Sequence, residues 1–151
     1  MKNITIEFLT DAVGKQQVMD VIHDIAIKAK SDEEYREIAK RITQVFYYLK
    51  SVGVPSKYKR TIKAYSKDGY EITLSEIVKE LTYHKPLLEV RINWHPVGAF
   101  RAIFFYEQDT QDNQILYFTK AVIKDGNHSE AFEHIVIESE IMMNDFYTKR
   151  E

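Results

Sequence analysis

Residues 87–123 contain the pattern that decides the fold. They read LLEVRINWHP, then VGAFRAIFFYEQDTQDNQ, then ILYFTKAVI. The three segments are rich in β-branched and aromatic residues, and turn-like breaks at 95–98 and 109–113 separate them. This alternation is typical of three antiparallel strands joined as a meander. Because Arg91, Arg101 and Lys120 are embedded in these strands, the meander is also the best candidate for a functional surface.

The predicted strands differ in how their two faces are covered. Successive strand residues point to opposite sides, so the first strand has an apolar face of Leu88, Val90, Ile92 and Trp94 and a polar face of Glu89, Arg91 and Asn93. The second strand, 100–107, is apolar on both faces except at Arg101, and the third, 115–123, except at Thr119 and Lys120. Such runs predict central strands that are covered on both sides.

A strand and two helices are predicted before the meander. Residues 3–9 alternate as a strand does, and a helix then begins at residue 10 or 11 and runs to about residue 30. Ser31 and Glu34 match the capping box that starts a helix, and Gly53 ends this second helix. Two helices with a short connection suggest a helical hairpin lying on the sheet.

The segment 56–85 carries weaker signals. Five cations lie between residues 57 and 67 with no acid among them, and an Asp-Gly turn at 68–69 favours a small hairpin of 61–65 against 70–73. Thr73 and Glu76 form another capping box, followed by apolar residues at helical spacing up to residue 81. They predict a short helix.

A final helix is predicted from about residue 129 to 147, which completes an α+β fold. The N-terminal strand and helical hairpin would pack on a mainly antiparallel sheet with a C-terminal helix. At 151 residues, we expect one domain over 1–151, with 56–85 as an elaborated segment.

Composition narrows the classes of protein that remain. The chain is 44% hydrophobic and 29% charged, as an ordinary globular protein is. It has no cysteine, which excludes disulfides and thiolate metal sites and is compatible with the cytoplasm. No apolar run approaches the roughly 20 residues of a membrane span, and residues 1–11 lack a signal-peptide core. We therefore expect a cytoplasmic protein with no membrane partner. The net charge of −2 argues against a nucleic-acid binder unless the cations cluster.

The segments LLEVRINWHPVGAFRAIFFYE and ILYFTKAVIKDG resemble the RelE/ParE/HigB superfamily of toxins from toxin–antitoxin pairs, especially its phage-derived members. Those chains share a strand of the form L-x-E-x-R, a turn, a strand that begins with arginine, and a strand leading to a lysine-bearing loop and a C-terminal helix. The matching pieces are 87–91, 101–105 and 115–124. The helical hairpin predicted before the meander matches as well.

The resemblance implies a toxin of a type II system that a cognate antitoxin protein neutralises. Many members cut mRNA in the ribosomal A site without a metal or other cofactor, others act on DNA gyrase, and some have no established activity. By position, Arg91 and Arg101 match the strand arginines, and Lys120 and Lys124 lie where basic residues follow the last strand. An mRNA endoribonuclease associated with the ribosome is thus implied. The alternative is a catalytically inactive, toxin-fold binding or regulatory protein of phage origin, which the acidic balance favours.

Metal-free RNA cleavage needs a base, a cation for the transition state and an acid for the leaving oxygen. Arg101 can clamp phosphate through its planar fork of donors, and Lys120 or Lys124 can add charge. His95 or His128 can transfer the proton.

Further residues are candidates for holding the substrate, and none for holding a metal. Trp94 can stack a base, and Arg91 can hold the RNA backbone. The cluster of Lys57, Lys59 and Arg60 can bind RNA or a partner. No histidine shows metal-ligand spacing.

Each candidate also has a structural explanation. Arg101 can pair with a carboxylate such as Glu89 or Glu107 and fix the strand register, and Arg91 can be a solvated cross-strand partner of such an acid. Trp94 has the parity of core residues, and His95 precedes a proline, as turn residues often do. The cations at 57–67 are also compatible with a solvated surface. The sequence leaves these alternatives open.

Overall fold

The computed structural model describes residues 2–66, 68–95, 97–124 and 129–150. Its elements are β1 (Ile4–Phe8), α1 (Gln17–Lys28), α2 (Glu33–Val52), the 3-10 turn η1 (Lys57–Lys59), β2 (Ile62–Tyr65), β3 (Glu71–Leu74), β4 (Val78–Glu80), β5 (Leu88–Trp94), β6 (Gly98–Gln108), β7 (Gln114–Lys124) and α3 (Glu130–Lys149). Within these ranges, three helices accompany a mixed five-stranded sheet and a separate two-stranded sheet. The predicted α+β class is confirmed.

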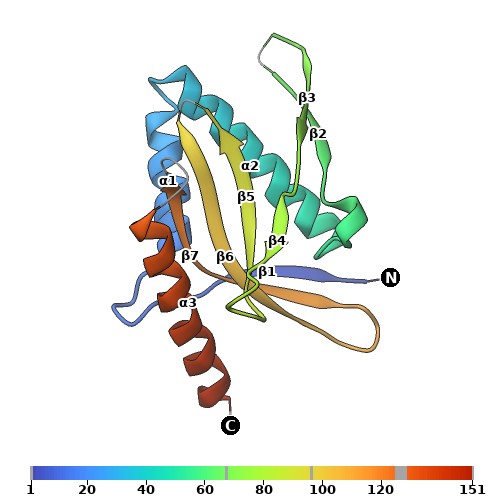
Figure 1. Ribbon diagram of the computed structural model, residues 1–151, viewed down its shortest axis with the longest axis vertical. Coiled ribbons are helices and arrows are strands. Elements are labelled where there is room, and N and C mark those ends of the chain that lie inside the picture. The colour runs from blue at the N-terminus through green and yellow to red at the C-terminus, as the bar shows by residue number, and fades with distance from the viewer. Residues whose placement is uncertain (1, 67, 96, 125–128, 151) are drawn as a thin grey trace.

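The main sheet has the strand order β1-β7-β6-β5-β4 (Figure 1). Strands β5, β6 and β7 form the predicted antiparallel meander, and β4 adds to the β5 edge. The first strand, β1, pairs with β7 in the parallel sense, with Ile4 opposite Gln114. The N-terminal strand therefore joins the sheet next to the last strand.

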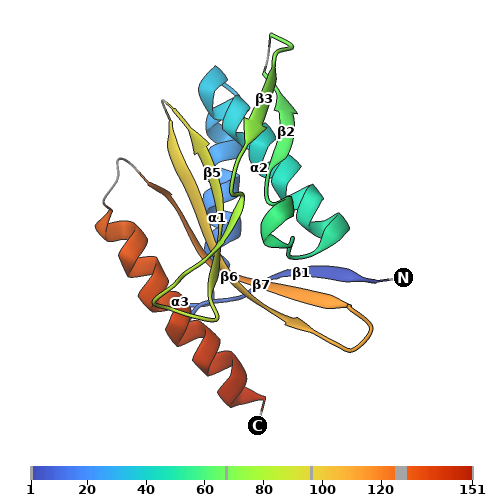
Figure 2. The same ribbon diagram turned by 45° about the vertical axis from the view of Figure 1, so that its right-hand side comes forward.

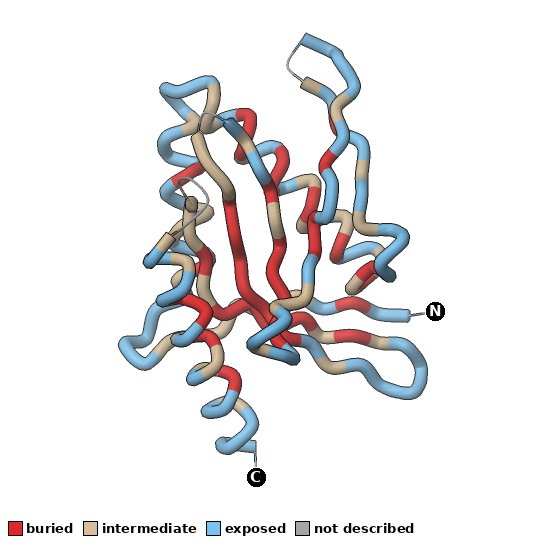
Figure 3. Tube along the Cα trace, viewed as in Figure 1, coloured by how far each residue is buried: buried red, intermediate tan, exposed pale blue. Residues whose placement is uncertain are grey.

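The helices cover opposite faces of the sheet, so the molecule has two hydrophobic cores (Figure 2). The larger core joins α1 and α2 to one face, with Ile38, Val45 and Phe118 buried in it. The smaller core joins α3 to the other face around Phe105 and Val136. Burial is concentrated in the central strands of the sheet (Figure 3), as their two-sided apolar sequence predicts.

Helix α2 begins and ends close to the predicted positions. Its N-cap is Asp32 rather than Ser31, because the Asp32 carboxylate accepts hydrogen bonds from the N–H groups of Glu34 and Tyr35, at 2.9 and 3.4 Å. Gly53 ends the helix with φ at +79°, a conformation that favours glycine.

The prediction that the first helix begins at residue 10 or 11 is wrong, because α1 begins at Gln17. The Asp11 carboxylate caps a turn instead, accepting hydrogen bonds from the N–H groups of Val13 and Lys15 at 3.0 and 2.9 Å. Gly14 lies in this turn with φ at +82°, outside the helical region.

The predicted helix after Thr73 is also wrong. The hairpin of β2 and β3 is present, but the chain then bends at Glu76, where φ is +47°, and continues as strand β4. The Ile77 carbonyl accepts a hydrogen bond from the N–H of Arg91 at 2.8 Å. The edge of β5 thus recruits this segment into the sheet, and tertiary pairing overrides its local helical spacing.

Candidate functional site

The strand register brings Arg91 and Arg101 together on the sheet face that carries α3. Arg91 lies directly opposite Arg101 in the β5–β6 ladder. Lys124 lies opposite Ala99, two residues before Arg101 on β6, and Lys79 lies opposite Glu89 on the edge strand. Because alternate residues of a strand share a face, all of these side chains point to one side. We call Lys79, Glu89, Arg91, Arg101 and Lys124 the cationic face.

Glu89 lies among the cations of this face. Its carboxylate Oε1 is 3.0 Å from Arg91 Nε and 3.9 Å from Arg101 Nε, and the residue is only 6% exposed. Burial raises the pKa of the Glu89 carboxyl above its ordinary value, although the charges of Arg101 and Arg91 oppose this rise. Its second oxygen, Oε2, is buried and accepts no hydrogen bond from the described residues. Buried acceptors are rarely left without a hydrogen bond, which makes this carboxylate unusual.

The two arginines differ in how far they reach solvent. The Arg101 side chain is 7% exposed and donates to Asn93 Oδ1 at 2.9 Å and to the carbonyl of Phe100 at 3.1 Å. Burial and the neighbouring charge of Arg91 lower the pKa of the Arg101 guanidinium. Arg91 is 22% exposed and pairs with Glu76 at 2.8 Å. A ligand therefore meets Arg91 first, while Arg101 supports it from within.

Two lysines extend the cationic face. Lys124 lies 5.2 Å from the centroid of the Phe132 ring on α3, and the charges of Lys79 and Lys124 both act on the Glu89 carboxylate. The face continues around the β4 edge into a hollow of about 210 Å³ that is lined by Lys57, Arg60, Glu76, Lys79 and Glu80.

Of the cations predicted at 57–60, Arg60 has the most extensive contacts. Its guanidinium binds both Glu80 oxygens, at 2.8 and 2.7 Å, and this pairing lowers the pKa of Glu80 to about 2. Lys57 and Lys59 are exposed in η1. Arg60 thus fixes the segment before β2 to the edge strand β4.

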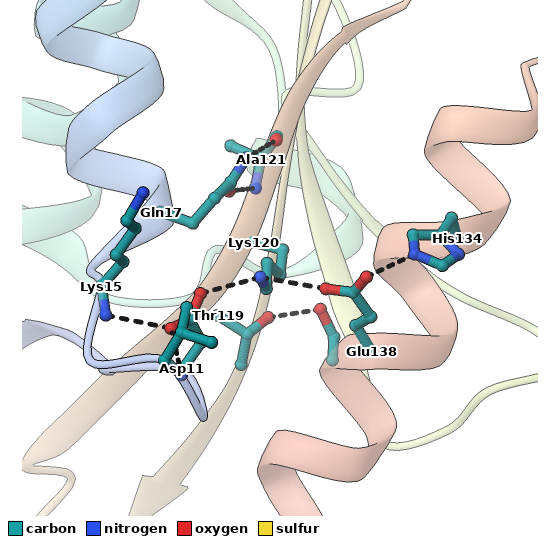
Figure 4. A network of polar contacts seen from close by, with 10 residues as sticks. Asp11, Lys15, Gln17, Thr119, Lys120, Ala121, His134 and Glu138 are labelled. Atoms are coloured by element: carbon teal, nitrogen blue, oxygen red, sulfur yellow. Dashed lines mark hydrogen bonds and ion pairs between the residues drawn. The ribbon is translucent and has the colours of Figure 1, made fainter.

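Lys120 belongs to a different site. Thr119 and Lys120 together oppose Ile103, because Ala121 pairs with Ala102 and Phe118 pairs with Phe104. This β-bulge on β7 turns Lys120 towards α3. Lys120 lies 3.0 Å from an Asp11 oxygen and 2.9 Å from a Glu138 oxygen (Figure 4).

The carboxylates around Lys120 hold it as a structural cation. Burial opposes its charged form, yet hydrogen bonds to Glu138 and Asp11 raise the pKa of Lys120 above its ordinary value. Glu138 also pairs with His134, and Thr119 hydrogen-bonds to Ser139 at 2.6 Å. Lys120 therefore ties the β1–α1 loop to α3.

The remaining predicted site residues lie apart from the cationic face. Trp94 packs into the opposite face, where its Nε1 donates to Glu34 at 3.1 Å and Arg41 lies 5.0 Å from its ring centroid. His95 is exposed in the turn after β5. His128 lies outside the described residues.

The sequence predicts Glu89 only as an ion-pair partner, and it does not predict its place between Arg91 and Arg101. The signal was present, because Glu89 and Arg91 share one parity of a strand whose other face is apolar. It did not identify Asp11 and Glu138 either. Their meeting at Lys120 depends on the bulge and on the packing of α3, and local sequence reveals neither.

The described part of the chain shows neither a metal site nor a membrane-spanning helix. No group of three or more His, Asp or Glu side chains there is arranged to hold a metal ion. None of the described helices has both the length and the apolar composition for crossing a membrane.

Comparisons with protein-family models, curated proteins and solved structures found no significant match to this chain.

Proposed function

We propose that the chain is a toxin of the RelE/HigB type that cuts mRNA without a metal ion, with the cationic face as its active surface. One observation carries this proposal: a buried carboxylate, Glu89, lies between Arg91 and Arg101, and one of its oxygens accepts no hydrogen bond from the residues that the structure describes. A base beside two guanidinium groups supplies two of the three parts that cleavage by the adjacent 2′-hydroxyl requires, and water can serve as the acid.

In this mechanism Glu89 takes the proton of the 2′-hydroxyl. The 2′-oxygen attacks phosphorus, the bond from phosphorus to the 5′-oxygen breaks, and the departing 5′-oxygen takes a proton from water. The products are a 2′,3′-cyclic phosphate and a 5′-hydroxyl. A carboxyl with a raised pKa is a better base near neutral pH than an ordinary one.

The cations of the face take different roles in binding the substrate and stabilising the transition state, according to their exposure to solvent. Arg91 contacts the scissile phosphate, and the buried Arg101 supports the charge that develops on it. Lys79 and Lys124 bind neighbouring phosphates, because they flank the arginines on the same face. Lys120 keeps the β1–α1 loop in place and takes no part in the chemistry.

The setting of this activity follows from the substrate. Ribosome-bound mRNA is cytoplasmic, and a toxin of this kind requires a cognate antitoxin protein. We expect the antitoxin gene to lie next to the gene of this chain.

The test is cleavage of ribosome-bound mRNA by the purified chain in the presence of a chelator, mapped by primer extension. We expect the wild type to cut, and Glu89→Gln to bind RNA without cutting. Lys28→Gln, which changes an exposed cation on α1 (50% exposed side chain), serves as the matched control and should cut normally. Intact mRNA with the wild type would exclude the nuclease.

A second candidate is a toxin-fold binding protein without catalysis. It is favoured by the burial of Glu89 and Arg101 and by the positions of two histidines, since His84 and His134 pair with carboxylates of α3. This candidate predicts that expression does not arrest growth. Affinity purification would then recover a defined protein partner while mRNA stays intact.

A further inference from the structure

The outer side of α3 carries an apolar patch that is open to solvent in the described part of the chain. Ile137 and Ile141 lie about one helical turn apart and are 54% and 56% exposed. Val13 of the β1–α1 loop is 77% exposed and lines a hollow together with Ile141 and Met142. We call Val13, Ile137, Ile141 and Met142 the α3 patch. Exposed apolar residues that gather in one place often mark a protein interface.

The composition of α3 indicates that its outer side is covered as well. A helix in the surface layer of a protein normally has one apolar stripe and an opposite polar face. On its inner side, α3 buries Ile135, Val136 and Met143 against the sheet, yet its outer side carries Ile137 and Ile141. A helix that is apolar on more than one side is normally buried on more than one side. Figure 2 shows α3 at the outside of the molecule, with no other helix beside it.

The shape of the α3 patch suits a copy of itself. Hollows of about 240 and 410 Å³ lie next to each other between the β1–α1 loop and α3, and Ile141 and Met142 line both. The charges in the smaller hollow are already satisfied, because Lys120 pairs with both Asp11 and Glu138. The groups left to contact a partner are therefore apolar. A surface with both protruding side chains and hollows can form the self-complementary interface of a twofold dimer.

The charges at the two ends of α3 favour a second copy in the antiparallel orientation. Glu130 lies in the first turn and Lys149 in the last. Both are exposed, and neither forms an ion pair with the residues that the structure describes. When Ile137 of one copy packs beside Ile141 of the other, the antiparallel register brings Lys149 within one residue position of Glu130 in the second copy. Twofold symmetry repeats this pair at the other end, whereas a parallel arrangement would place like charges together.

We infer that the α3 patch is the interface of a homodimer in which two copies of α3 pack antiparallel about a twofold axis. The isoleucines form the apolar centre of this interface, and the pairs of Glu130 with Lys149 form part of its polar rim. Exposed ion pairs add little affinity but favour one orientation, so the apolar centre supplies most of the binding free energy. Because α3 is only about 30 Å long, we expect a dissociation constant on the order of 10 µM.

This inference does not depend on the proposed nuclease. The α3 patch lies on the outer side of a helix and on the β1–α1 loop, whereas the cationic face consists of side chains of the sheet. A chain that dimerises but leaves mRNA intact would exclude the nuclease and retain the dimer.

Sedimentation equilibrium of the full chain between about 2 and 200 µM tests the dimer. We expect the wild type to change from monomer to dimer across this range, and Ile141→Lys to stay monomeric throughout, because it places a charge at the apolar centre. The matched control is Ile27→Lys, which changes an isoleucine of α1 that is 49% exposed and should dimerise as the wild type does. Circular dichroism checks that both variants are folded.

Charge reversal tests the antiparallel orientation. Glu130→Lys and Lys149→Glu each bring like charges together at both ends of the interface, and we expect each to raise the dissociation constant about fivefold at low salt. The double variant Glu130→Lys/Lys149→Glu restores opposite charges and should dimerise about as well as the wild type. In a parallel dimer the double variant would gain nothing over the single variants.

Three results would overturn the dimer: a wild type that stays monomeric at about 200 µM, a dimer that persists in Ile141→Lys, or a dimer that is lost equally in Ile27→Lys. A monomeric wild type would leave the α3 patch to a different protein. Equal dissociation constants for the wild type and the three charge variants would overturn the antiparallel orientation.

Discussion

Arg91 and Arg101 face each other directly across the β5–β6 ladder, a like-charge pair inside a folded sheet. Like charges at opposite positions destabilise a pair of strands. Glu89 offsets this repulsion, because its carboxylate lies within 3.0 Å of one guanidinium and 3.9 Å of the other. The pair is therefore stable only as part of a triad.

The first prediction concerns this triad. At pH 7.5, Glu89→Gln should lower the free energy of unfolding by about 2 kcal/mol, because it leaves the buried Arg101 without a counter-ion and Arg91 with Glu76 alone. Adding Arg101→Met should restore part of the loss, since it removes the repulsion. Urea unfolding of the two single variants and the double variant gives the coupling energy. Additive losses would show that Glu89 does not shield the arginines.

The second prediction is a pH dependence from Glu80. Arg60 holds the pKa of this carboxyl at about 2 in the folded chain, against 4.5 as the ordinary value. A lowered pKa stabilises the fold above pH 4.5, and the contribution disappears as pH falls through 2. Because Glu80 is 38% exposed, screening limits the effect at pH 7 to about 1 kcal/mol. The stability of wild type minus Glu80→Gln should fall towards zero between pH 4.5 and 2, and a difference that is constant with pH would contradict this.

The third prediction concerns the cation that ties the β1–α1 loop to α3. Lys120→Met leaves Asp11 and Glu138 without their shared partner, and the side chain is only 12% exposed. We expect a loss of about 2 kcal/mol and faster amide exchange at residues 9–16. Lys28→Met removes an exposed pair one helical turn apart and should cost under about 0.5 kcal/mol. Unchanged amide exchange at residues 9–16 would show that Lys120 does not hold the β1–α1 loop to α3.

The fourth prediction compares three glycines with positive φ. A Cβ at Gly53 would lie 2.5 Å from Gln114 Oε1 and 2.9 Å from Ile4 Cδ1, whereas at Gly14 and Gly69 it would meet nothing within 4 Å. Gly53→Ala should therefore cost roughly 3 kcal/mol, from backbone strain and crowding together. The other two substitutions should cost about 1 kcal/mol each. Thermal unfolding of the three variants measures the order of their losses in stability. Equal losses would mean that the residues around Gly53 move to make room for the added Cβ.

Much of the fold could be read from the sequence, because its strongest signals are local. The meander, the hairpin at 61–73 and the last helix are set by alternation, turn residues and a serine cap. The failures came where distant contacts decide. Residues 74–81 have helical spacing, but the open edge of β5 makes their second half a strand. The parallel pairing of β1 with β7 has no local signature at all.

The candidate site could be predicted less well. Parity alone placed Glu89 and Arg91 on one face, and the register of neighbouring strands added Arg101 and Lys124. The family resemblance placed Lys120 with these residues, but it lies in the bulge of β7 and points to Asp11 and Glu138 instead. Trp94 lies with the core, as its parity suggested.

The union of β1 with β7 has a consequence for the order in which the chain folds. Asn3 donates its backbone N–H to the Asn113 side chain, 110 positions away, so this edge closes the longest loop among the strand pairings. Closing a loop of that length costs conformational entropy before any stabilising contact can form. The helical hairpin and the meander, whose contacts are local, should therefore form first. Until β1 docks, the edge of β7 remains an open template for other chains, and this interval is when the protein is most prone to aggregate.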